Sequence, residues 1–191
     1  MLVEDLQNYR RQFESIKTDA QSLLGDLTGL QFNWHPSPDR WSIAQCIDHL
    51  VVTGRDSLSN IHRAINQARS KGLFSQGPFR YGLMEKWFVR QMEPPARMRF
   101  KAPKAYMPSG DQSYAEIVTS FYSLQEEFLQ GIDEASGIDL SRTKVSNAVS
   151  WWFRLSLGQE LAFNAAHERR HLWQAWGVKK ELDFPRMPTA V

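Results

Sequence analysis

Residues 156–177 read SLGQELAFNAAHERRHLWQAWG, and this stretch decides the fold class. Ser156 and Gln159 have the spacing of a capping box, in which a hydroxyl and an amide side chain satisfy free backbone groups at a helix N-terminus. Gly177 is typical of the position just past a helix C-terminus, because glycine readily adopts positive φ. The stretch therefore predicts one helix that begins after Ser156 and stops at Gly177.

Three other segments place apolar residues three and four positions apart, as the buried face of a helix requires. They predict helices over residues 4–27, 43–69 and 113–135. Residues 70–110 contain five prolines and a short helical piece near residues 81–91, so they form a connection long enough to cross over. Four long helices with little strand signal predict an all-α four-helix bundle. Two of these helices also open with capping boxes, Ser42–Gln45 and Ser113–Glu116.

Composition narrows the class of protein further. The chain has 191 residues without a break in composition, which predicts a single domain over residues 1–191. The net charge is only +2 and the basic residues are dispersed, which disfavours a nucleic-acid-binding surface. No apolar run approaches the ~18 residues that a membrane span needs. We therefore expect a cytoplasmic protein that binds neither nucleic acid nor membrane.

Two of the five histidines, His167 and His171, lie four residues apart within the last predicted helix. Residues at that spacing lie on the same helix face, so both imidazoles can reach one metal ion. His49 borders the inward face of the second long helix and is the candidate third ligand. Three neutral imidazoles suit Zn²⁺, Ni²⁺ or Fe²⁺ and leave coordination positions open for water or substrate. The competing interpretation is that these histidines are only packed polar groups.

The string from His167 to His171 also fits H-E-x-x-H, the zinc-protease pattern in which the glutamate is the general base. The extended pattern fails, because its later positions fall on Gln174 and Gly177, and no strand is predicted to align a peptide substrate. We therefore disfavour a protease. Glu168 remains a candidate catalytic base beside the site, or else a partner of the adjacent arginines.

Other polar residues are assigned by helical phase. Asn164 and Gln174 are three residues from a histidine and are expected to bond imidazole N–H groups or bound water. Glu160 and Asp56 lie two turns from their nearest histidines and are expected on a solvated face.

Two segments together carry a family resemblance. Residues 41–51 (WSIAQCIDHLV) and 157–174 (LGQELAFNAAHERRHLWQ) resemble the DinB/YfiT-like superfamily of DinB-like metalloenzymes. The resemblance implies an up-down-down-up four-helix bundle, which agrees with a long crossover between the second and third long helices. It also implies a divalent metal held by His49, His167 and His171, with Zn²⁺, Ni²⁺, Fe²⁺ and Mn²⁺ as candidates.

The same resemblance implies a homodimer and a reaction on a small molecule. Characterised branches of the superfamily transfer low-molecular-weight thiols onto electrophiles, or catalyse related isomerisation and hydrolysis. The first functional hypothesis is thus a metal-dependent transferase or hydrolase with an open three-histidine site. The second is a non-catalytic metal-binding protein or stress-linked dimeric binding module.

Overall fold

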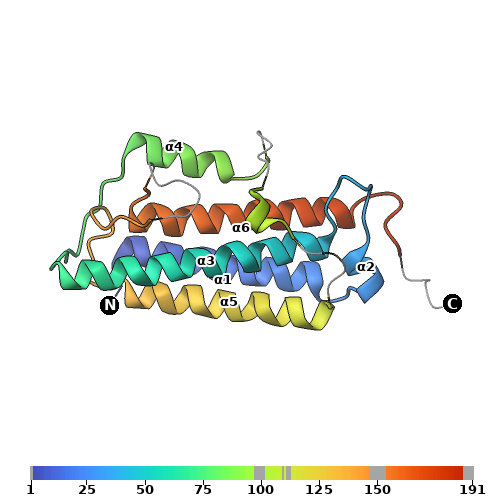
Figure 1. The fold of residues 1–191 in the computed structure, drawn as a ribbon, viewed down its shortest axis with the longest axis horizontal. Helices are drawn as coiled ribbons and strands as arrows, with labels where there is room; N and C mark the ends of the chain where they lie inside the picture. Colours follow the sequence, from blue (N-terminus) through green and yellow to red (C-terminus); the bar gives the residue numbers. More distant parts are fainter. Residues whose placement is uncertain (1, 97–101, 109, 111–112, 147–153, 187–191) are drawn as a thin grey trace.

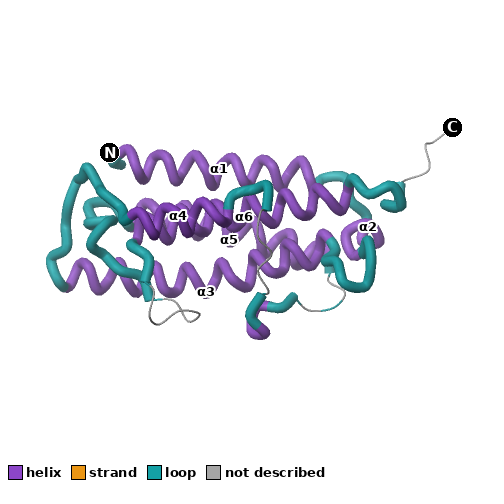
Figure 2. The backbone as a smooth tube through the Cα atoms, turned by 90° about the horizontal axis from the view of Figure 1, so that it is seen from above, coloured by secondary structure: helices purple, strands orange, loops and turns teal. Residues whose placement is uncertain are grey.

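The computed structural model describes residues 2–96, 102–108, 110, 113–146 and 154–186. Within these residues all regular secondary structure is helical, and β-pairing is limited to two isolated bridges, Phe74 with Ile138 and Lys144 with Ser156 (Figure 2). The fold class is therefore all-α, as predicted. The helices are α1 (Glu4–Leu24), α2 (Gly29–Asn33), α3 (Ile43–Ser70), α4 (Leu83–Met92), the 3₁₀-helix η1 (Lys104–Tyr106), α5 (Tyr114–Glu134) and α6 (Leu157–Lys179).

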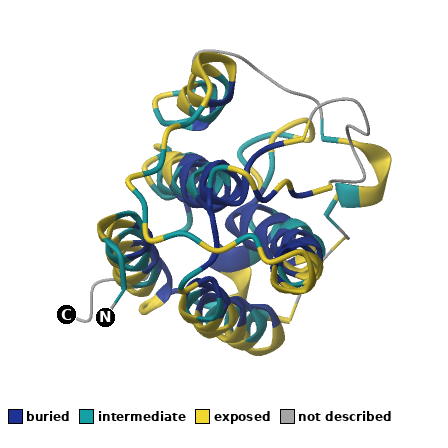
Figure 3. Ribbon diagram, turned by 90° about the vertical axis from the view of Figure 1, so that its left-hand side faces the viewer, coloured by how far each residue is buried: buried dark blue, intermediate teal, exposed yellow. Residues whose placement is uncertain are grey.

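The four long helices α1, α3, α5 and α6 lie side by side (Figure 1). Both α1 and α3 pack against α5 and α6, so the apolar faces of all four meet in one core. Buried residues line the inner faces and exposed residues the outer ones (Figure 3). The short helix α4 packs on the outer side of α6, which leaves α6 covered by three other helices.

The apolar spacing of the first helix matches its buried face. Seven of its residues are buried, and Phe13 stacks on Phe128 of α5 with ring centroids 4.6 Å apart. The helix ends at Leu24 rather than at the predicted residue 27, and a second, short helix begins at Gly29. Thr28 and Gln31 form a reciprocal capping box that opens α2, a signal the sequence analysis did not use.

The predicted cap of α3 is confirmed. The Ser42 hydroxyl accepts from the Gln45 amide at 3.1 Å, and the Gln45 side chain accepts from the Ser42 amide at 3.2 Å. This cap fixes where α3 begins and hence the helical phase of His49, seven residues later.

The predicted caps of the other two long helices are wrong in detail. Ser113 and Ser156 occupy the N-cap positions, but neither side chain caps its helix. At α6 a carboxylate from α4 takes over: Glu85 accepts from the Ser156 amide at 2.9 Å, and from Lys144 at 2.8 Å. A carboxylate is favoured there because the helix N-terminus is electropositive. The α6 helix also continues through Gly177 to Lys179, so the predicted stop is two residues early.

No helix in the described part of the chain combines the length and apolar character needed to cross a membrane.

Two glycines of α6 should respond oppositely to alanine substitution. A Cβ at Gly158 would approach the Tyr81 hydroxyl to 2.2 Å, and that hydroxyl is bonded to Asp5 at 2.8 Å. We expect Gly158→Ala to lower the free energy of unfolding by about 1–3 kcal/mol through overpacking. At Gly177 a Cβ meets nothing within 4 Å, so Gly177→Ala should raise the free energy of unfolding by about 0.5–1 kcal/mol. Urea unfolding of both variants checks this, and equal effects would contradict it.

Candidate metal centre

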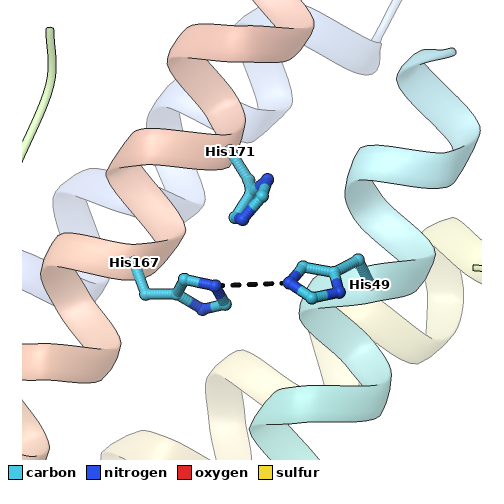
Figure 4. A group of neighbouring side chains, drawn as sticks. All are labelled: His49, His167 and His171. Carbon is cyan, nitrogen blue, oxygen red and sulfur yellow. Dashed lines mark hydrogen bonds between the residues drawn. The ribbon is translucent and has the colours of Figure 1, made fainter. Parts of the chain in front are cut away.

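Three imidazoles from two packed helices converge on one point (Figure 4). His49 comes from α3, and His167 and His171 come from successive turns of α6. The Nε2 atoms of His49 and His167 lie 3.3 Å apart, and one nitrogen from each ring lies within 4.8 Å of the other two. Among the described residues, this is the one group of three or more His, Cys, Asp or Glu side chains so placed.

The separation of the His49 and His167 nitrogens suits two ligands of one ion. Tetrahedral zinc with Zn–N bonds of ~2.0–2.1 Å places neighbouring nitrogens ~3.3–3.4 Å apart. The observed Nε2 to Nε2 distance is 3.3 Å. The spacing of these two nitrogens therefore fits two ligands of one divalent ion.

The backbone of η1 fixes the orientation of His49. The Nδ1 atom of His49 lies 2.8 Å from the carbonyl oxygen of Tyr106. Because a carbonyl oxygen can only accept, Nδ1 must carry the proton and Nε2 must carry the lone pair. The lone pair of His49 is thus directed at the centre of the cluster, an arrangement typical of metal-ligating histidines.

Aromatic rings enclose the cluster on two sides. Trp41 stacks on His171 with centroids 5.7 Å apart and planes 22° apart, and its ring lies 5.1 Å from that of His49. On the other side Phe163 stacks on His167 at 5.8 Å, and Phe88 of α4 stacks on Phe163 at 5.3 Å. Packing, rather than hydrogen bonding alone, therefore holds the three rings in place.

Burial keeps the three imidazoles neutral. Removal from water lowers the pKa of His49, of His171 and of His167, the last to about 3. Each protonated ring would also repel its neighbours, which lowers the pKa values of His167 and His171 further. Neutral imidazoles have a free lone pair, so the cluster is ready to bind a cation at neutral pH.

The three imidazoles differ in exposure. His49 and His171 are only 4% and 8% exposed, whereas His167 is of intermediate exposure. Of the three rings, His167 is therefore the one least covered by the rest of the protein.

A buried polar network lies two turns from the histidines, where a solvated face was expected. Glu160 is only 3% exposed, and its Oε1 accepts from the Ser57 hydroxyl at 2.8 Å. The Asn164 amide donates to the same Ser57 oxygen at 2.7 Å and to the Glu160 carbonyl at 2.8 Å, so these bonds link it to this network rather than to an imidazole. Asp56 is partly buried and accepts from the Tyr106 hydroxyl at 2.9 Å. The expectation for Glu160 was wrong because α3 packs over this face of α6.

Glu168 lies in the interior, outside the three-imidazole cluster. Its side chain is 2% exposed, and burial raises the pKa of its carboxyl to about 8. The side chains of Gln125 and Arg169 oppose that shift but do not cancel it. The carboxyl therefore holds a proton at neutral pH in the folded protein.

An all-helical chain that presents three neutral imidazoles at one point fits a metal-binding protein. A comparison with known protein families matches residues 12–175 to the DinB superfamily. Because this match spans most of the chain, the chain belongs to the DinB superfamily, and the resemblance seen in the sequence is confirmed. No curated protein and no solved structure shows significant similarity to it.

The shifted pKa of Glu168 makes a prediction for the metal-free protein. A carboxyl with a pKa of about 8 when folded and about 4.5 when unfolded binds more protons when folded, so stability falls as pH rises between these values. Glu168→Gln removes this dependence. Its melting temperature relative to wild type should therefore rise progressively from pH 5 to pH 8, measured by thermal unfolding after chelation.

The matched control is Glu127→Gln, which removes an exposed carboxyl from α5. That variant should show no difference from wild type that grows with pH. A constant difference between wild type and Glu168→Gln across the pH range would show that the buried carboxyl is ionised in the folded state.

Proposed function

We propose that this chain is a divalent-metal-dependent enzyme that acts on a small molecule through an open three-histidine site, by thiol transfer or hydrolysis. The observation that carries the proposal is the convergence of His49, His167 and His171, with the His49 lone pair fixed by the Tyr106 carbonyl. Membership of the DinB superfamily supports the same conclusion.

In this proposal the three histidines hold the ion, and Zn²⁺, Ni²⁺, Fe²⁺ and Mn²⁺ are the candidates. Once bound, such an ion supplies Lewis acidity that favours the ionised form of a thiol or of water. The protein contributes three neutral ligands without a carboxylate, so the charge of the ion is not offset. The partly exposed side of His167 provides the approach for a small substrate, with a low-molecular-weight thiol as the preferred class.

Glu168 is the candidate acid–base residue of the proposal. A group with a pKa of about 8 is suited to proton transfer near neutral pH, because both of its protonation states are accessible. Glu168 directly follows His167, one of the three proposed metal ligands, in the sequence. Loss of turnover with retained metal in Glu168→Gln would support this role.

The proposal also includes a single domain over residues 1–191 with up-down-down-up topology. The sequence colours in Figure 1 support this order, since they run in one direction along α1 and α6 and in the other along α3 and α5. A homodimer, which the family resemblance implies, and a cytoplasmic location, which the sequence composition led us to expect, complete the proposal.

The decisive test is the metal content of untagged protein, measured by elemental analysis for wild type, His49→Ala and His171→Ala. We expect about one ion per chain in wild type and little in either variant, because two remaining imidazoles bind far more weakly. His35→Ala is the matched control, since His35 is exposed and its Nδ1 contacts the Arg40 carbonyl at 3.0 Å. Absence of metal from reconstituted wild type would overturn the proposal.

Cobalt substitution separates a catalytic site from a closed one. If the site is open, a small thiol added to the Co²⁺-substituted protein should change its visible spectrum by entering the coordination sphere. An unchanged spectrum would instead favour a non-catalytic metal-binding protein.

A further inference from the structure

Tyr106 contacts α3 at two points, one through its backbone and one through its side chain. Its carbonyl oxygen accepts from His49 Nδ1 at 2.8 Å, and its hydroxyl donates to Asp56 Oδ2 at 2.9 Å. His49 and Asp56 are seven residues apart, which places them two turns apart on the same face of α3. Tyr106 therefore lies lengthwise along α3, with its side chain extending from the cluster to the carboxylate.

We propose that Tyr106 is a positioning residue: the bond from its hydroxyl to Asp56 holds its carbonyl on His49 and so selects the imidazole tautomer that leaves Nε2 free. The benefit to metal binding rests on the proposed function. The effect on the tautomer does not, because it concerns the metal-free protein.

The acceptor for the Tyr106 hydroxyl is itself held in place. The Asn60 side chain donates to the Asp56 carbonyl at 2.9 Å and lies 3.4 Å from Asp56 Oδ2. Arg63 in turn donates to the Asn60 side-chain oxygen at 3.0 Å. Because Asn60 and Arg63 both lie on α3, the Asp56 carboxylate has a partner on its own helix besides the Tyr106 hydroxyl.

Within the described residues, the contacts that hold η1 beside His49 are those it makes with α3. The η1 helix is a single turn of three residues, and its packing within the described structure is against α3. A short 3₁₀ turn has poor internal hydrogen-bond geometry and does not hold its own position. A hydrogen bond to a carboxylate is stronger than one between neutral groups, so the Tyr106 hydroxyl supplies the stronger attachment.

Loss of this attachment has a specific chemical consequence. A neutral imidazole carries its proton on either nitrogen, and only the Nδ1–H form has an Nε2 lone pair directed at the cluster. When the carbonyl is no longer held at Nδ1, the Nε2–H form becomes populated and its proton occupies the position a metal ion requires. Removal of the hydrogen-bond partner of a ligating histidine typically weakens metal affinity 10–100-fold.

The test uses four variants of the full-length chain. Tyr106→Phe and Asp56→Ala each remove one partner of the bond, whereas Asp56→Asn keeps an oxygen that can accept from the hydroxyl. Tyr114→Phe is the matched control, because it likewise removes a tyrosine hydroxyl that donates a hydrogen bond, in this case to the Leu24 carbonyl of α1 at 2.7 Å. The tautomer of His49 is measured in metal-free protein by ¹H–¹⁵N NMR of the imidazole at pH 7.5, and zinc affinity by competition with a chromophoric chelator.

We expect wild type, Asp56→Asn and Tyr114→Phe to show the Nδ1–H tautomer alone. Tyr106→Phe and Asp56→Ala should show a mixture of tautomers and about 10-fold weaker zinc binding. A double variant that combines Tyr106→Phe with Asp56→Ala, made in addition to these four, should bind zinc no more weakly than either single variant, because both substitutions remove the same bond. An unchanged tautomer in Tyr106→Phe, or an equal change in Tyr114→Phe, would overturn the proposal. If the tautomer shifts as expected but wild type binds no zinc, the positioning role stands and the proposed function fails.

Discussion

The contact between α3 and α6 is the constraint on which the rest of the structure depends, because each helix carries part of the site. His49 faces His167 and His171 across this contact, and two turns away Ser57 faces Glu160 and Asn164. The remaining helices maintain this contact, since α1 and α5 fill the core beneath it and α4 covers α6 from outside. The cap that starts α3 at Ser42 then sets which residues of that helix face α6.

Stability alone does not explain the residues at this contact. Burying imidazoles and a carboxyl removes them from water at a cost that apolar side chains of similar size would avoid. The lowered pKa values of the histidines and the raised pKa of Glu160 express that cost, since burial disfavours the charged form of each group. A fold that retains such groups at its central contact departs from apolar packing there, as proteins do at functional sites. The surrounding apolar core, including stacked Phe13 and Phe128, offsets the cost.

Much of this organisation could be predicted from the sequence, because helical spacing and caps are local signals. The long helices and the three histidines follow from periodicity, and the buried side of α1 agrees residue by residue. Contacts made by distant chain segments could not be predicted in the same way. Glu85, seventy-one residues away in the sequence, accepts from the Ser156 amide in the place that the predicted capping box gave to Gln159. Tyr106 acts on His49 through its carbonyl group, which every residue has, so no residue type marks it.

The sequence does contain a signal for the buried network around Glu160, although the sequence analysis did not use it. Glu160, Asn164, His167 and His171 follow one another at spacings of four, three and four, so they form one polar line along α6. An isolated polar line on a surface helix is usually solvated, but α6 is covered by α1, α3 and α4, and on such a helix any polar line must find partners inside the protein. For Glu160 and Asn164 these partners include Ser57 of α3. At the other end of the line, His167 and His171 face the Nε2 side of His49, whose Nδ1 is held by the Tyr106 carbonyl, so the two ends of the same line have different partners.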